Sequence, residues 1–101
     1  MNKKIRTPQT ERVFKAILQL KTIDECCDFF EDICTVNEVM SIAQRFEVAE
    51  MLRDNKTYMQ IAEKTGAWTA TISRVNRSLN YGSDGYDLVM NRMKEEEQED
   101  K

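Results

Sequence analysis

The sequence predicts an all-α protein of about six helices, with a central pair of short helices joined by a tight turn. Three observations predict this class. Only one proline and three glycines occur among 101 residues, and 33% of the residues are charged. Apolar residues also recur at spacings of three and four, which is the period of a helix with one buried face. A chain of this length forms one small domain.

The first three helices are expected from about Gln9 to Leu20, from Thr22 to about Asp32, and from Thr35 to about Arg53. The second and third begin with Thr-x-x-Glu, a capping box in which threonine and glutamate satisfy free N–H groups of the first turn. The apolar stripes are Val13, Phe14, Ile17, Leu18 and Leu20 in the first helix and Val39, Ile42, Ala43, Phe46, Ala49 and Leu52 in the third. The second helix is expected to bury Cys26, Phe29, Phe30 and Ile33.

The segment from Tyr58 to Arg77 has the pattern of a helix-turn-helix, with a second helix that enters the DNA major groove. Thr57 can cap its first helix, and Gly66 ends that helix where a positive φ is needed. Thr65 departs from the pattern, because an apolar residue is more usual just before the glycine. The second helix opens at Trp68 or Thr69 and has a buried stripe of Ile72, Val75 and Leu79. Its opposite face carries Thr69, Ala70, Thr71, Ser73, Arg74 and Arg77, which can contact base edges and phosphates.

The ends of the chain differ in composition from its centre. Residues 1–8 form a basic arm that is expected to be flexible, and residues 9–94 form the helix-turn-helix domain. A loop is expected over Asn80–Gly85 and a last helix from about Tyr86. The final residues, 95–101, contain five acids and one base and are expected to be a disordered acidic tail.

The formal net charge of −3 reflects this tail, because the rest of the chain carries about +1. The segment Lys56–Asn80 contains four bases and one acid, and the N-terminal arm adds Lys3, Lys4 and Arg6. Two such faces in a dimer would give a modest positive footprint for DNA.

Cys26, Cys27 and Cys34 are an odd number of cysteines in a chain without histidine, so they make a poor metal site and are expected to be buried and reduced. No cofactor is expected. No apolar run is long enough to span a membrane, and no signal peptide is recognisable, so a cytoplasmic location is expected.

The order of helices resembles that of the tryptophan repressor superfamily, especially its bacterial branch of small repressor-like proteins. The resemblance covers residues 9–94 and is carried by Thr35-Val-Asn-Glu-Val39, the long helix to Arg53, and above all the segment Thr65–Leu79 with its Gly-Ala-x-x-Ala-Thr-Ile-Ser-Arg core. It implies an intertwined homodimer whose two recognition helices meet successive major grooves of a two-fold symmetric operator.

The resemblance also implies site residues. Expected DNA contacts are Gly66, Trp68, Thr69, Ala70, Thr71 and Ser73, more weakly Tyr58 and Met59, and, from the charge pattern, Lys56, Arg74 and Arg77. Positions matching the tryptophan pocket of the family are Gln44, Arg45, Thr71, Arg74, Val75 and Ser78. Val75 replaces a glycine that makes room for the indole, and Gln44 stands where the family has an arginine. Tryptophan binding is therefore not expected, and no small-molecule effector is assigned.

These observations predict a homodimeric, sequence-specific DNA-binding transcriptional regulator, a repressor that binds double-stranded DNA without tryptophan. The alternative is a protein-interaction module that keeps the fold without specific DNA binding, which the overall acidity and Trp68 favour. An enzyme is not expected, because histidine, a glycine-rich phosphate loop and a nucleophile motif are missing from the sequence.

Overall fold

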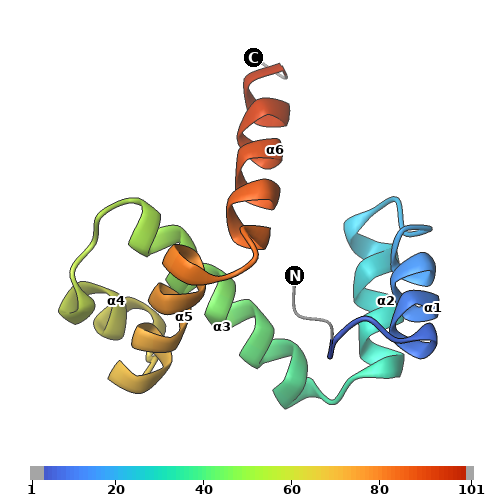
Figure 1. Ribbon diagram of the computed structural model, residues 1–101, viewed down its shortest axis with the longest axis horizontal. Helices are drawn as coiled ribbons and strands as arrows, with labels where there is room; N and C mark the ends of the chain where they lie inside the picture. The colour runs from blue at the N-terminus through green and yellow to red at the C-terminus, as the bar shows by residue number, and fades with distance from the viewer. Residues whose placement is uncertain (1–3, 100–101) are drawn as a thin grey trace. The chain divides into compact units, whose positions relative to one another are not determined.

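The computed structural model describes residues 4–99, which form six α-helices without a strand (Figure 1). The helices are α1 (Pro8–Ile17), α2 (Ile23–Ile33), α3 (Val36–Arg53), α4 (Tyr58–Thr65), α5 (Thr69–Tyr81) and α6 (Gly85–Glu99). The all-α class and the number of helices predicted from the sequence are confirmed. The chain divides into two compact units, the first ending at Ser41 and the second beginning at Ile42, so that α3 contributes to both.

The first unit contains α1, α2 and the beginning of α3. The Thr7 side chain caps α1 by accepting a hydrogen bond from the Thr10 N–H, and Pro8 takes the first helical position, where no N–H is needed. The helix ends at Ile17 rather than at Leu20. There, hydrogen bonds between residues three apart, from Gln19 N–H to the Ala16 carbonyl and from Leu20 N–H to the Ile17 carbonyl, tighten the chain into turns. Residue 8 therefore belongs to α1 and not to the basic arm, of which residues 1–3 lie outside the described residues.

Threonine caps begin α2 and α3, as the sequence predicts. Thr22 Oγ1 accepts from the Glu25 N–H, and Thr35 Oγ1 accepts from the Glu38 N–H. The Glu38 carboxylate in return accepts from the Thr35 N–H at 2.8 Å. These hydrogen bonds, from the Thr35 backbone and side chain, hold the pKa of Glu38 below its usual value. This cap therefore stabilises the fold fully when the pH is above the usual glutamate pKa. The stabilisation is lost as the pH falls through the lowered pKa of Glu38.

The apolar residues of the first unit remain accessible within one chain. In the described residues up to Ser41, no side chain is buried. The expectation that α2 buries Cys26, Phe29, Phe30 and Ile33 is wrong for the single chain: Cys26 and Ile33 are exposed, and the two phenylalanines are half-buried. Cys27 is also exposed and Cys34 is half-buried, so the cysteines are not buried as expected, although all three are free thiols. The physical reason is that α1 and α2 have no layer of the same unit to cover their outer apolar faces.

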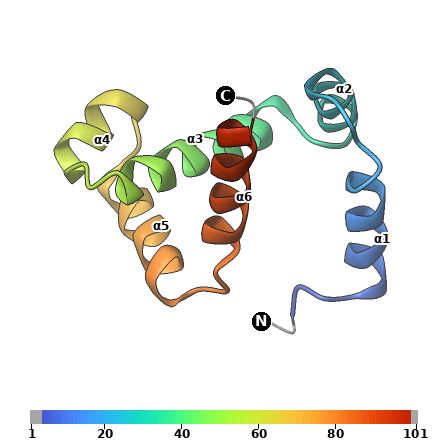
Figure 2. The same ribbon diagram turned by 90° about the horizontal axis from the view of Figure 1, so that it is seen from above.

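The second unit has a true hydrophobic core. Val48 and Ala49 of α3, Ile61 of α4, and Ile72 and Val75 of α5 are buried together with Ala67 of the α4–α5 turn. Both views show α4 and α5 beside the C-terminal part of α3 (Figures 1 and 2). The core thus lies where the two short helices meet the long one.

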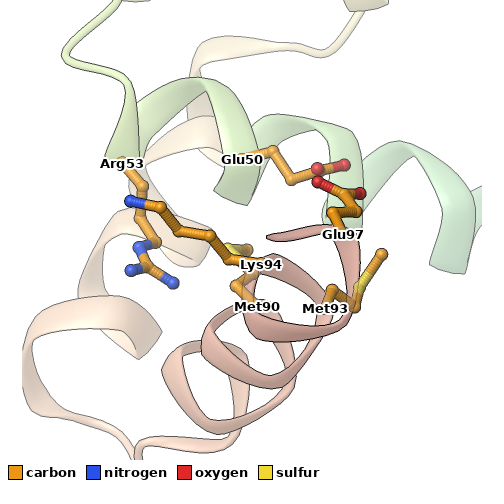
Figure 3. A pocket seen from close by; sticks show the side chains of 6 residues that line it. All are labelled: Glu50, Arg53, Met90, Met93, Lys94 and Glu97. Atoms are coloured by element: carbon orange, nitrogen blue, oxygen red, sulfur yellow. The ribbon is translucent and has the colours of Figure 1, made fainter. Parts of the chain in front are cut away.

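Polar and aromatic contacts hold α6 against α3. The rings of Phe46 and Tyr86 have centroids 6.3 Å apart, and the Arg53 guanidinium donates to Asn91 Oδ1 at 2.8 Å. Arg53 also pairs with Asp87 at 3.6 Å. Beyond these contacts the two helices line a cavity of about 180 Å³. Glu50 of α3 and Glu97 of α6 are among the residues that line this cavity (Figure 3).

The second half of α6 differs from the prediction. The helix continues to Glu99, so residues 95–99 of the expected disordered tail are helical, whereas residues 100 and 101 lie outside the described residues. Glutamate and glutamine have high helix propensity, which allows the helix to propagate through this charged segment once its first turns are packed on α3. The loop before α6 is shorter than predicted, because Asn80 and Tyr81 complete α5 and Gly85 begins α6.

Candidate nucleic-acid interface

The first helix of the candidate interface, α4, is fixed at its start by a complete capping box. Thr57 Oγ1 accepts from the Gln60 N–H, and Gln60 Oε1 accepts from the Thr57 N–H. Immediately before it, Lys56 is exposed and its ammonium lies 3.5 Å from Asp54 Oδ2. Of the two helix residues predicted to contact DNA, Met59 is exposed, whereas Tyr58 packs against the core. Lys56 and Met59 are thus accessible at this end of α4, and Tyr58 is half-buried.

The turn between α4 and α5 has the geometry that its sequence predicts. Gly66 has φ 74°, a left-handed conformation, and its N–H donates to the Ala62 carbonyl at 2.9 Å. Thr65 uses its hydroxyl twice, donating to the Ile61 carbonyl at 2.7 Å and accepting from the Ala67 N–H at 3.1 Å. Ala67 is buried, so a small side chain is required there. The turn is therefore tied both to α4 before it and to the core beneath it.

Helix α5 divides cleanly into a buried face and an exposed face. Ile72 and Val75 are buried, and Leu79 packs beside them. Ala70, Ser73, Arg74 and Arg77 follow the i, i+3, i+4, i+7 spacing of a single helix face and are all exposed. Thr69 is also exposed, whereas Thr71 is half-buried at the edge of this face. We call Thr69, Ala70, Ser73, Arg74 and Arg77 the outer face of α5.

The N-terminus of α5 has no side-chain cap. Trp68 is the N-cap residue, it makes no side-chain capping hydrogen bond, and its side chain is 81% exposed. The N-terminus of a helix carries partial positive charge, and uncapped N–H groups there suit a phosphate oxygen. One side of the second unit thus presents small residues, two arginines and an uncapped helix N-terminus.

The described residues contain no group of three or more His, Cys, Asp or Glu side chains placed to hold a metal ion. Within the same residues, no helix is long and apolar enough to cross a membrane. The outer face of α5 itself offers hydroxyl groups, a methyl group and cationic side chains.

Comparison with known proteins identifies this arrangement. The family model for the Trp repressor protein matches residues 8–94. The chain belongs to the Trp repressor protein family. This is a family of DNA-binding regulators, which are not enzymes, and the site described above is its helix-turn-helix.

Three proteins are similar to this chain over nearly its whole length. The uncharacterized protein YerC of Bacillus subtilis (strain 168) is 53% identical over 96 residues, which are 95% of this chain and 92% of that protein. The crystal structure of a TrpR-like protein from Eubacterium eligens is 64% identical, with a TM-score of 0.89 over 92% of this chain and 96% of that one. The crystal structure of a candidate Trp repressor from Staphylococcus aureus is 46% identical, with a TM-score of 0.89 over 93% of this chain and 95% of that one.

The positions expected to match the tryptophan pocket of the Trp repressor family differ in their burial. Val75 is 2% exposed and belongs to the core. The side-chain amide of Gln44 donates to the Thr65 carbonyl at 3.1 Å, so this position is already used within the chain. Arg45, Arg74 and Ser78 are exposed, and Thr71 is half-buried.

The contact between Gln44 and Thr65 was not predicted from the sequence. The two residues are 21 positions apart, and a hydrogen bond from a side chain to a backbone carbonyl leaves no pattern in side-chain types. The one available signal was Thr65 itself, a polar residue at a position where an apolar one is usual.

Proposed function

We propose that this protein is a homodimeric, sequence-specific DNA-binding transcriptional regulator that represses by occupying a two-fold symmetric operator, and that it does so without tryptophan. One observation carries the proposal. Helix α5 buries Ile72 and Val75 behind the left-handed turn at Gly66 and exposes its outer face of small polar and cationic residues.

The outer face of α5 has the right chemistry for the major groove. Ser73 and Thr69 can donate to or accept from base edges, and the methyl group of Ala70 can contact the methyl group of thymine. Arg74 and Arg77 can hold phosphate or guanine, and the open N-terminus of α5 favours a phosphate. Because Thr69, Ala70 and Ser73 on this face are small, the helix backbone can approach the bases closely there.

The homodimer is supported by the accessible apolar residues of the first unit. Helices α1 and α2 line a groove of about 610 Å³, with Val13, Ala16, Phe29 and Ile33 among its residues. Leu18, Ile23 and Val36 are also largely exposed. A second copy of the chain would bury these residues, and a two-fold dimer presents two α5 helices to a symmetric operator.

Independence from tryptophan is supported at the pocket positions. Val75 places a branched side chain in the core where an indole would need room, and Gln44 is engaged with Thr65. Val75 thus occupies the space that a bound amino acid would require, and Gln44 is already engaged in a hydrogen bond within the protein.

A selection of bound sequences from a random pool of double-stranded DNA tests the proposal. It is read at two salt concentrations, with and without added L-tryptophan. We expect a two-fold symmetric motif that is recovered equally well in both cases. Enrichment only with tryptophan would contradict ligand independence, and enrichment without any motif would contradict sequence-specific recognition.

Exposure of Trp68 favours a second candidate function, a protein-interaction module that has kept the fold. Tryptophan is enriched among residues that dominate the binding energy of protein interfaces, and Trp68 is 81% exposed. In this case Trp68→Ala would abolish the binding of a protein partner, and that binding would persist at high salt. DNA binding would instead weaken strongly with salt.

A further inference from the structure

Helix α3 is joined to the helix-turn-helix by a directional contact as well as by apolar packing. The Gln44 side-chain amide, half-buried on α3, donates to the carbonyl oxygen of Thr65 at 3.1 Å. Val48 and Ala49 of α3 and Ile61 of α4 also pack together in the apolar core. Apolar burial is not directional, whereas a hydrogen bond weakens steeply when its geometry is lost. The Gln44 amide is therefore suited to set the position of the turn.

The carbonyl that Gln44 contacts is a critical one for the turn. Thr65 is the last residue of α4, and the last four carbonyls of a helix have no partner within it. The same residue also accepts the Ala67 N–H through its hydroxyl, across Gly66. One connected set of hydrogen bonds thus runs from α3, through Thr65, to the residue that leads into the N-cap of α5.

We propose that Gln44 is a positioning residue that anchors the α4–α5 turn on α3 and thereby sets the outer face of α5 for reading a base sequence. This inference rests on the proposed function and extends it from the residues that contact DNA to one that acts through Thr65. Helix α5 begins only four residues after Thr65. A shift of the turn on α3 would therefore also move Thr69 and Ala70 relative to the major groove of bound DNA.

Three substitutions distinguish the effect of the hydrogen-bond donor of Gln44 from the effect of the size of its side chain. Gln44→Met keeps the length and removes the donor, Gln44→Glu keeps the shape and replaces the donor with an acceptor, and Gln44→Arg retains N–H donors. A net hydrogen bond of ordinary strength corresponds to roughly a threefold to tenfold change in an equilibrium constant. We therefore expect Gln44→Met and Gln44→Glu to lose roughly that factor in the ratio of operator to non-operator affinity. Gln44→Arg should retain the ratio.

Asn91→Ala is the matched control. It removes the hydrogen bond from Arg53 of α3 to Asn91 of α6, which is also a contact between helices but does not reach the turn. A general loss of stability would affect both variants alike. We expect Asn91→Ala to lower thermal stability and to leave the ratio of operator to non-operator affinity unchanged.

Trp68 gives a readout that does not depend on DNA. It is the only tryptophan of the chain, it occupies the N-cap position of α5, and it lies three residues after Thr65. We expect its fluorescence anisotropy to decay faster in Gln44→Met than in the wild type or in Asn91→Ala. We also expect the Ala67 amide to exchange its hydrogen faster in Gln44→Met.

These measurements separate the failure of this inference from that of the proposed function. If the wild type selects no operator, the proposed function fails, and faster anisotropy decay and amide exchange in Gln44→Met still support the anchoring of the turn. If an operator exists and Gln44→Met keeps the wild-type affinity ratio, the positioning role is overturned. Unchanged anisotropy and exchange in Gln44→Met would overturn the anchoring itself.

Discussion

At the scale of single residues, the turn shows how a departure from a sequence pattern can have a structural reason. Thr65 stands where an apolar residue is more usual, yet its hydroxyl bonds both the Ile61 carbonyl and the Ala67 N–H. Its own carbonyl accepts from Gln44, 21 residues earlier. The sequence indicated that the position is unusual. It could not indicate the partner, because that contact exists only after α3 and α4 have packed together.

Gly66 supports a prediction that depends on the backbone alone. Its φ is 74°, and a Cβ atom built there would have no other atom within 4 Å. Gly66→Ala should therefore lower the free energy of unfolding by about 1 kcal/mol through left-handed strain, without a steric clash. Gly66→Asn should cost less, since asparagine tolerates this conformation better. Denaturant unfolding at a fixed protein concentration measures both.

Gly85→Ala is the control for this experiment. Gly85 begins α6, and a Cβ atom there would also meet nothing within 4 Å, but its φ is not left-handed. We expect alanine at this position to be neutral or slightly stabilising. Equal stability of the Gly66→Ala and Gly85→Ala variants would show that the turn does not require the left-handed conformation.

At the scale of helices, the first residue of a helix was easier to predict from the sequence than the last. Thr22, Thr35 and Thr57 each accept a backbone N–H of the first helical turn, as their sequence contexts predict. The N-terminal signal is local, because cap and N–H lie within three residues. The end of α6 is different, since its charged residues continue a helix that begins with packing on α3. The sequence predicted a last helix from about Tyr86, but it did not indicate that this helix continues through the charged segment.

The outer face of α5 supports a prediction about salt dependence. If Arg77 binds a phosphate, Arg77→Gln should weaken operator binding and lower the slope of log affinity against log salt by about one unit. If Arg77 instead reads guanine, the slope should change little and the preference at one base pair should relax. Titrations of the selected operator and of single-base variants at several salt concentrations distinguish the two roles.

Arg92→Gln is the corresponding control, because Arg92 is an exposed arginine on α6 and not on the outer face of α5. It removes the same charge from the chain. An equal decrease of affinity and slope in both variants would mean that only the net charge matters, and would argue against α5 as the helix that contacts DNA.

At the scale of the whole molecule, the two units differ in what one chain can bury. The second unit has a core of six buried apolar residues, whereas no described residue of the first unit is buried. Sequence periodicity predicted the burial of Ile72 and Val75 on α5 correctly. On α3 it was less accurate, because Ile42 of the predicted stripe is exposed and Val48 beside the stripe is buried. Periodicity could not distinguish an apolar stripe that the same chain covers from one that the same chain leaves accessible, because both have the same spacing. The incorrect expectation of buried residues on α2 has this origin.

If a second copy covers the first unit, stability must depend on protein concentration. The midpoint of thermal unfolding should rise as the wild-type protein is concentrated, because association stabilises the folded state by mass action. Ile33, which lines the α1–α2 groove and is 50% exposed in one chain, should then be important. Fully burying an isoleucine side chain contributes about 1.5–3 kcal/mol, so roughly half of that remains to be gained at each of the two Ile33 residues of a symmetric dimer. Ile33→Gln should therefore shift the dimer toward monomer in sedimentation and abolish the concentration dependence.

Tyr81→Gln provides the comparison for Ile33→Gln. Tyr81 is 85% exposed at the end of α5 in the second unit, so its replacement removes an apolar side chain from a surface that the dimer does not require. We expect this variant to sediment as the wild type does. A wild-type midpoint that is independent of concentration, together with a monomeric mass, would contradict the dimer. The apolar groove between α1 and α2 would then need a different occupant.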